Sequence, residues 1–233
     1  METWRVPKAL AIIPDGNRRW ARSHRLSILN GYSIGVKKFI EFGEWCKDYG
    51  INNVTVWAFS SDNVSRPSEE VNALFSIYKK VANDDDIRNM LHRNKTKLSI
   101  IGERRLLPKD LLKSLHKLET ETSMYKDRVI NMLMGYGGRE DLLYAAKRTA
   151  RAIAKNKRIK FEQYFRDSLL SNSIPNLDLI IRTSGEMRLS GFMPWQANHS
   201  ELYFSDKLWP DFAKSDLDSA LKDYSSRNRR FGK

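Results

Sequence analysis

One carboxylate and three guanidinium groups follow directly after an apolar run early in the sequence. The run ends at Pro14, and Asp15, Arg18, Arg19 and Arg22 come next. Arginine side chains bind phosphate oxygens in a forked geometry, whereas a carboxylate repels phosphate unless a divalent cation lies between the two. These residue types therefore indicate either a site for a metal-bound phosphate or, more simply, an ordinary Pro-Asp-Gly turn.

Three later loops favour the phosphate site. They are SSDNVSRP, GYGGR and RTSGEMRLS, and each follows an apolar run. Glycines let a ligand approach the backbone, hydroxyl and amide groups donate hydrogen bonds, and arginines bind phosphate, so we predict a site for more than one phosphate group. Mg²⁺ takes few protein ligands and completes its shell with water and phosphate oxygens. We therefore interpret Asp15 as one Mg²⁺ ligand and Glu201 as a second.

The order of apolar segments predicts the scaffold that positions these loops. Predicted strands alternate with predicted helices about six times, and most strands are nearly continuous apolar runs. This pattern is typical of a mostly parallel sheet covered on both faces, in which ligands bind at the carboxyl ends of the strands. We predict an α/β fold with a central six-stranded sheet, in one domain over residues 1–233. The predicted strands are residues 9–13, 53–59, 97–101, 128–134, 177–182 and 201–204, and the predicted helices are residues 33–49, 67–83, 109–125, 139–156, 160–170 and 214–228.

Composition bounds the class of protein. The chain has 233 residues, of which 41% are hydrophobic, so it is too apolar for disorder. It has no apolar run long enough for a membrane span or a signal peptide, and we expect a cytoplasmic location. The single cysteine, Cys46, lies in a helical apolar pattern, which favours a buried structural thiol over a nucleophile.

The formal net charge of +13 indicates an anionic partner: nucleic acid, an acidic membrane surface or a phosphorylated small molecule. The basic segments at residues 147–160 and 227–233 carry no recognised nucleic-acid-binding motif, so we do not expect nucleic acid. We interpret them as a solvated face or as a peripheral membrane surface. A Walker-type loop, a Gly-x-Gly-x-x-Gly after the first predicted strand and a metal-ligand spacing of histidines are all absent from the sequence.

The chain resembles the cis-prenyltransferases, the Z-prenyl diphosphate synthases that include undecaprenyl diphosphate synthase, in five ordered motifs. These motifs are DGNRRWA, FSSDNVSRPSEEV, GYGGR, IIRTSGEMRLSGFMPWQ and ELYFSDKLWPDF, and they extend over nearly the whole chain. The resemblance implies a homodimer with a hydrophobic tunnel for the growing isoprenoid. It also implies Mg²⁺-dependent condensation of an allylic prenyl diphosphate with isopentenyl diphosphate to a Z-prenyl diphosphate.

The resemblance also implies roles for individual residues. Asp15 and Glu201 are expected to act with Mg²⁺, Arg66 to hold or ionise the allylic diphosphate, and Asn63 to assist proton loss. Asp15, Asn63 and Arg66 are thus the expected catalytic residues. The expected substrate-binding residues are Gly16, Asn17, Arg18 and Arg19 around the allylic diphosphate, Arg182, Arg188 and Ser190 around the second diphosphate, and Arg230 and Gly232 reaching across the dimer. Trp20 is expected to bind substrate as well, as is Ser60, which lies near Asn63.

Five positions differ from the family pattern. Pro14 replaces a methionine, Ile28 an arginine, Tyr32 a histidine, Val64 an aromatic residue and Met187 a histidine. The missing arginine and histidine belong to the allylic diphosphate pocket. A charge-assisted hydrogen bond contributes about 1.5–3 kcal/mol, so losing one weakens diphosphate binding roughly ten- to a hundredfold unless another group compensates.

These differences leave three hypotheses open. We favour regular condensation with isopentenyl diphosphate. The alternative is a specialised member that uses a short allylic substrate or joins two allylic diphosphates in an irregular, non-head-to-tail condensation, as enzymes resembling lavandulyl diphosphate synthase do. A non-catalytic partner subunit is disfavoured, because such partners typically lose the aspartate and phosphate-binding residues that this chain retains.

Overall fold

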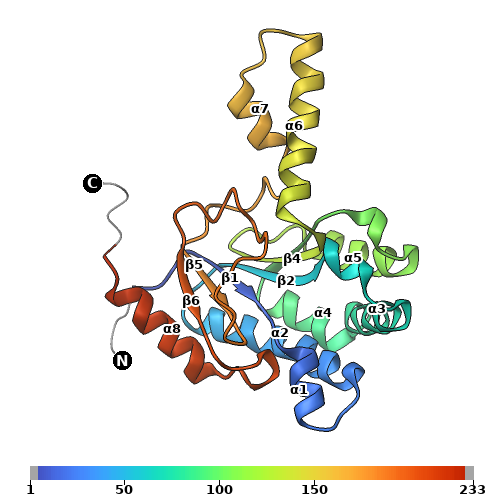
Figure 1. The fold of residues 1–233 in the computed structure, drawn as a ribbon, viewed down its shortest axis with the longest axis vertical. Helices are drawn as coiled ribbons and strands as arrows, with labels where there is room; N and C mark the ends of the chain where they lie inside the picture. Colours follow the sequence, from blue (N-terminus) through green and yellow to red (C-terminus); the bar gives the residue numbers. More distant parts are fainter. Residues whose placement is uncertain (1–4, 229–233) are drawn as a thin grey trace.

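A single parallel sheet forms the centre of the computed structural model, which describes residues 5–228 (Figure 1). Within this part of the chain, six strands run in the order β3-β4-β2-β1-β5-β6, and every neighbouring pair is parallel. This confirms the predicted fold class. The strands are β1 (Ala9–Ile13), β2 (Asn53–Ser60), β3 (Thr96–Ile101), β4 (Arg128–Tyr136), β5 (Leu179–Arg182) and β6 (Glu201–Phe204).

Helices pack against one face of this sheet, and loop residues of the segment 170–197 cover the other. Two helices, α1 and α4, were not predicted from the sequence. Helix α1 is short and basic and has only two buried residues. Helix α4 begins after Asp84, whose side chain accepts from the amides of Asp86 and Ile87. Helix α2 also begins earlier than predicted, at the Ser27 cap. The helices are α1 (Asn17–Ser23), α2 (Ile28–Asp48), α3 (Ser68–Ala82), α4 (Asp85–Arg93), α5 (Lys109–Thr122), α6 (Gly138–Lys155), α7 (Phe161–Ser168) and α8 (Lys214–Ser226).

The central strand β1 explains why the predicted strands are continuous apolar runs. All five of its residues are buried. Leu10 and Ile12 pack into the core that contains α2 and α8, whereas Ala9, Ala11 and Ile13 pack into a core on the opposite face. Because successive side chains of a strand point to opposite faces, a strand covered on both sides has no polar face to show in its sequence.

The strand order places a crevice beyond the end of β1. The chain leaves β1 for β2 on one side and later returns to β5 on the other. In open parallel sheets, ligands bind outside the carboxyl ends of the strands where the direction of winding changes in this way. The loops that begin at Pro14, Ser61 and Thr183 follow β1, β2 and β5 and therefore surround this crevice.

The state of Cys46 agrees with the expectation from the sequence. Cys46 is fully buried and unpaired, and burial raises the pKa of its thiol, as expected of a structural cysteine. Among residues 5–228, no helix combines the length and the apolar character needed to cross a bilayer.

Candidate functional site at the carboxyl end of the sheet

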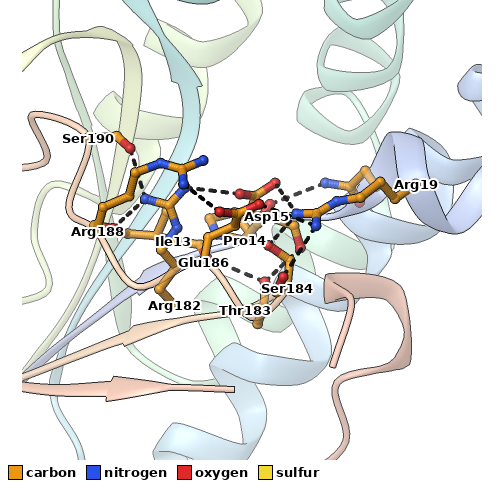
Figure 2. Close-up of polar contacts among 11 residues, drawn as sticks. Ile13, Pro14, Asp15, Arg19, Arg182, Thr183, Ser184, Glu186, Arg188 and Ser190 are labelled. Atoms are coloured by element: carbon orange, nitrogen blue, oxygen red, sulfur yellow. Dashed lines mark hydrogen bonds and ion pairs between the residues drawn. The ribbon is translucent and has the colours of Figure 1, made fainter. Parts of the chain in front are cut away.

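Asp15 lies between two guanidinium groups just beyond β1 (Figure 2). Arg182 donates from Nη2 to Asp15 Oδ2 at 3.0 Å, and Arg19 Nη2 lies 3.6 Å from Oδ1. The parallel register pairs Ile13 with Arg182, so the pairing of β1 with β5 brings these groups together. The Thr183 hydroxyl donates to the Asp15 carbonyl at 2.7 Å and fixes the turn between strand and helix.

The charge of Asp15 is set by this environment. Burial by itself raises the pKa of Asp15, but the hydrogen bond and the charge of Arg182, together with the charge of Arg19, outweigh burial and hold the pKa below its ordinary value. The carboxyl group is therefore ionised at neutral pH. Its side chain is 33% exposed, so an ionised oxygen remains accessible to a ligand.

Arg182 connects Asp15 to the loop after β5. Its side chain is only 6% exposed, and Nη1 donates to Ser190 Oγ at 2.9 Å and to the carbonyl of Arg188. Glu186, which the sequence did not single out, forms ion pairs with both Arg188 and Arg19. Glu186 therefore balances part of the positive charge of this loop.

Two polar cavities meet at Asp15. The larger, of about 450 Å³, lies between α1, α2 and the loop after β2. The smaller, of about 260 Å³, lies toward Arg182, Ser60 and Ser190. Asp15, Asn63 and Arg66 line both. The larger cavity is further lined by residues predicted to bind the allylic diphosphate, namely Gly16, Asn17, Arg18 and Arg19, and by Arg22 and Tyr32.

Asn63 and Ser60 hold the short 3₁₀ helix (Ser61–Ser65) that borders both cavities. The Ser60 hydroxyl accepts from the Asn63 amide at 3.2 Å, and Asn63 Oδ1 accepts from the Ser60 amide at 3.2 Å. The side chain of Asn63 is therefore fixed through its oxygen, which leaves its Nδ2 group directed away from this cap.

Glycines allow α1 to pack closely against α2. A Cβ atom on Gly35 would overlap Oδ1 of Asn17, whose Nδ2 donates to the Pro14 carbonyl at 3.3 Å. Gly16, at φ 108°, provides the left-handed turn into α1. The backbone around Asp15 is thus positioned by contacts that a larger side chain would disturb.

Gly35→Ala is expected to displace Asn17 and to destabilise the protein by about 1–3 kcal/mol through overpacking. It should also weaken binding of inorganic pyrophosphate to the larger cavity, measured by calorimetry. Gly43→Ala in the same helix is the matched control, because its Cβ would lie 3.5 Å from Ile130, an ordinary contact. Equal pyrophosphate affinity in both variants would contradict the packing role of Gly35.

Several predicted site residues lie elsewhere. Trp20 is buried, and its indole donates to Asp211 at 2.6 Å, so it anchors α1 and does not line either polar cavity. The GYGGR loop does not line them either, since the Gly138 amide donates to the Gly191 carbonyl at 3.1 Å and supports the loop that carries Ser190. Arg230 and Gly232 lie outside the described residues.

The predicted pairing of Asp15 with Glu201 in one metal site does not occur within this chain. Glu201 is paired in register with Leu179, whereas Arg182, the partner of Asp15, is paired with Phe204. Three residues along a strand span roughly 10 Å, so Glu201, the first residue of β6, lies toward the amino-terminal ends of the strands and away from Asp15. There it accepts from Arg227 at 2.9 Å.

The donor set around Asp15 fits a phosphate-bound cation and not a metal cage built from protein side chains. Within residues 5–228, no group of three or more His, Cys, Asp or Glu side chains could hold a metal ion. Mg²⁺ commonly takes one or two carboxylates and completes its octahedron with phosphate oxygens and water. One accessible carboxylate among arginines suits that arrangement.

A small apolar cavity adjoins the larger polar cavity. It has a volume of about 80 Å³ and shares Val36, Phe39 and Tyr78 with the polar cavity. It extends between α2 and the sheet to Arg128, whose Nη2 donates to the Gly43 carbonyl. The open tunnel expected from the resemblance is not seen within residues 5–228, since this cavity has a volume of only about 80 Å³.

Comparison with known proteins gives consistent matches. A family model described as putative undecaprenyl diphosphate synthase matches residues 13–232. The chain is 39% identical over 235 residues to an isoprenyl transferase of Thermus thermophilus, covering 98% of this chain and 89% of that protein. It is 37% identical over 233 residues to dehydrodolichyl diphosphate synthase 1 of Arabidopsis thaliana, covering 97% of this chain and 76% of that protein.

Two solved structures are similar over the whole chain. One is lavandulyl diphosphate synthase from Lavandula x intermedia in complex with dimethylallyl diphosphate, with a TM-score of 0.92, 34% identity, and coverage of 98% of this chain and 99% of that one. The other is a probable undecaprenyl diphosphate synthase from Campylobacter jejuni, with a TM-score of 0.78, 28% identity and coverage of 100% of both chains.

Proposed function

The chain belongs to the undecaprenyl diphosphate synthase family of cis-prenyltransferases, and we propose that it condenses an allylic prenyl diphosphate with isopentenyl diphosphate in the presence of Mg²⁺. The observation that carries this proposal is the position of Asp15. Its ionised carboxylate lies where two polar cavities meet, between Arg182 and Arg19. Two cavities with one carboxylate between them suit two diphosphates and one cation.

The reaction requires charge to be stabilised on a leaving group. The allylic carbon–oxygen bond breaks, and its electron pair leaves with the diphosphate. The π electrons of the isopentenyl double bond form the new carbon–carbon bond, and a proton is then lost from the isopentenyl unit. Donors aimed at charge that develops in the transition state usually make the largest catalytic contribution. Mg²⁺, when bound, supplies further positive charge to the leaving diphosphate.

Residues of the larger cavity are assigned to the allylic substrate. Arg18, Arg19 and Arg66 line that cavity and would bind the leaving diphosphate, with Asp15 holding the cation at its edge. Asn63 lies on the wall common to both cavities. It is therefore the residue that we place beside the proton lost from the second substrate.

The smaller cavity is assigned to isopentenyl diphosphate. Arg182 and Ser190 line it, and Arg188 is held beside them through its carbonyl group. Arg230 and Gly232 remain predicted contributors from a second chain. Glu201 is not needed for this assignment, because Mg²⁺ can be held by one carboxylate and phosphate oxygens.

Irregular coupling of two allylic diphosphates is the second candidate. The TM-score with lavandulyl diphosphate synthase is 0.92, against 0.78 with the probable undecaprenyl diphosphate synthase. In addition, Ile28 packs against the apolar core and brings no cation to the pocket. The 80 Å³ apolar cavity is smaller than the roughly 150 Å³ that accommodates benzene, so a chain of about one isoprene unit suits it. These observations favour a short allylic substrate in either reaction.

The purified protein should be incubated with Mg²⁺ and dimethylallyl or geranyl diphosphate, with and without isopentenyl diphosphate, and the products identified by mass spectrometry. A product that requires isopentenyl diphosphate supports regular condensation. A product formed without it supports irregular coupling and rejects the regular reaction. No product from any combination would overturn the proposed activity and favour a non-catalytic partner subunit.

We also propose a homodimer. Helices α6 and α7 project from the body of the molecule (Figure 1), and Phe161 at the start of α7 is 58% exposed. It stacks on Phe165 at 5.8 Å between ring centroids, and Phe165 lies 5.2 Å from Trp195. Such exposed aromatic surface is typical of an interface. Light scattering is expected to give the mass of two chains, and the mass of one chain would contradict the proposal.

A cytoplasmic location with peripheral membrane association remains a prediction. Residues 147–160 carry many of the basic side chains of α6 and the loop that follows it. Sedimentation with anionic lipid vesicles at physiological salt tests whether this charge binds a membrane.

A further inference from the structure

Tyr32 lies in the wall of the larger polar cavity, between an arginine and a glutamate. Its hydroxyl donates to Glu70 Oε1 at 2.6 Å and accepts from Arg66 Nη1 at 2.6 Å. Tyr32 is 6% exposed, and the Glu70 side chain is 10% exposed. Glu70 also lies 3.5 Å from Arg18 and 3.6 Å from Arg66, so two cations and one phenol surround a single buried carboxylate.

The chemistry of a phenol fixes the direction of both hydrogen bonds. A neutral tyrosine has one hydrogen to donate, and an ionised carboxylate can only accept. Burial and the hydrogen bond to Glu70 raise the pKa of Tyr32, which keeps the phenol neutral. The hydrogen is therefore committed to Glu70, and a lone pair faces Arg66. Tyr32 has no hydrogen left for a phosphate oxygen.

This arrangement controls which way Arg66 points. Nη1 is held by Tyr32, while Nη2 and Nε contact no acceptor in residues 5–228 and are left for a ligand in the cavity. Without the hydroxyl, Glu70 is the acceptor nearest to Nη1, at 3.6 Å. A direct Arg66–Glu70 ion pair would then draw the guanidinium toward α3 and away from the ligand.

We propose that Tyr32 is a positioning residue, which holds the Arg66 guanidinium toward the diphosphate of the allylic substrate and does not itself bind that diphosphate. The inference rests on the proposed function, because it assigns the larger cavity to the allylic substrate. It differs from the expectation that residue 32 simply lacks a phosphate-binding group. The hydroxyl acts through Arg66, so its contribution exists only when Arg66 is present.

A double-mutant cycle tests this dependence. Tyr32→Phe is expected to weaken binding of inorganic pyrophosphate, measured by calorimetry, about tenfold. Arg66→Met should weaken it by about ten- to a hundredfold, and Tyr32→Phe in the Arg66→Met background should change it less than twofold further. Equal effects of Tyr32→Phe in both backgrounds would show direct binding by Tyr32. Wild-type affinity in Tyr32→Phe would show that its role is packing alone. Either result overturns the proposal.

Tyr136→Phe is the matched control. Tyr136 is also a buried phenol that donates to a carboxylate, Asp141, at 3.1 Å, but it lines neither polar cavity. The Tyr136→Phe substitution should therefore leave the affinity for pyrophosphate unchanged.

Kinetics separate this inference from the proposed activity. Tyr32→Phe should lower kcat with the allylic substrate about tenfold, because Arg66 acts on the leaving group. A wild-type protein that binds pyrophosphate without transferring prenyl groups would refute the activity but not the positioning, which the binding cycle tests independently.

Discussion

Asp15→Asn is expected to lower the rate of prenyl transfer by about 10²- to 10³-fold while the protein stays folded. Removing a single preorganised group that stabilises transition-state charge typically costs that much. The asparagine keeps the shape of the side chain and an oxygen that can accept from Arg182, so the loss reports the negative charge and not the packing. Without that charge, the cation that we propose beside the diphosphate would lose its carboxylate ligand at the point where the two cavities meet.

The measurement is kcat at saturating allylic diphosphate, together with the Mg²⁺ concentration that gives half the maximal rate, which should rise. Asp178→Asn is the control. Asp178 accepts from the amides of Lys8 and Ala9 at the start of β1. The substitution therefore removes one negative charge at the amino-terminal end of the strand that Asp15 follows. It should leave kcat unchanged. An Asp15→Asn variant that keeps more than about a tenth of the wild-type rate would refute the role given to Asp15.

The scaffold was predictable because burial on both faces leaves a direct trace in the sequence. The run at residues 9–13 is apolar at every position, as a strand covered on both sides must be. The parallel order then brings loop residues from distant segments together, which explains why Asp15 and Arg182 are neighbours although 167 positions separate them. Loops that follow strands were therefore sufficient to predict which residues line the polar cavities beyond β1.

The missing parts share a different physical cause. Helix α1 carries arginines that line the larger polar cavity, and it packs closely against Gly31 and Gly35 of α2, a contact that no local pattern reveals. Glu70 lies in the first turn of α3, and its role as acceptor for Tyr32 depends on a tertiary contact that the local sequence does not reveal. The position of Glu201 depends on strand register, which motif order does not encode.

Arg182→Met is expected to have the second large effect, on stability as well as on catalysis. Arg182 is almost completely buried and donates to Asp15, Ser190 and the Arg188 carbonyl. Removing one partner of a fully buried ion pair costs about 3–5 kcal/mol. Because Asp15 is one-third exposed and partly screened by water, we expect a loss of roughly 2–3 kcal/mol at pH 7.

The pH dependence of that loss identifies its cause. In the wild-type protein Arg182 and Arg19 hold the pKa of Asp15 below its unfolded value of about 3.9 despite burial. A carboxyl group with a lowered folded pKa contributes stability above the unfolded pKa and loses it as the pH falls through the folded pKa. In Arg182→Met, burial is no longer offset to the same extent, so the pKa of Asp15 rises. The difference in unfolding free energy between the two proteins should therefore be largest near neutral pH and shrink below about pH 4.

Urea unfolding at pH 7 and at pH 3.5 measures this difference, and steady-state kinetics provide the functional readout. KM for isopentenyl diphosphate should rise about ten- to a hundredfold, because the smaller cavity loses its buried cation. Arg188→Met is the control for stability, since Arg188 is 60% exposed and its pairing with Glu186 lies at the surface, where ion pairs contribute at most about 1 kcal/mol. A loss of stability in Arg182→Met that is equal at both pH values would mean that packing, and not the pair with Asp15, gives Arg182 its importance.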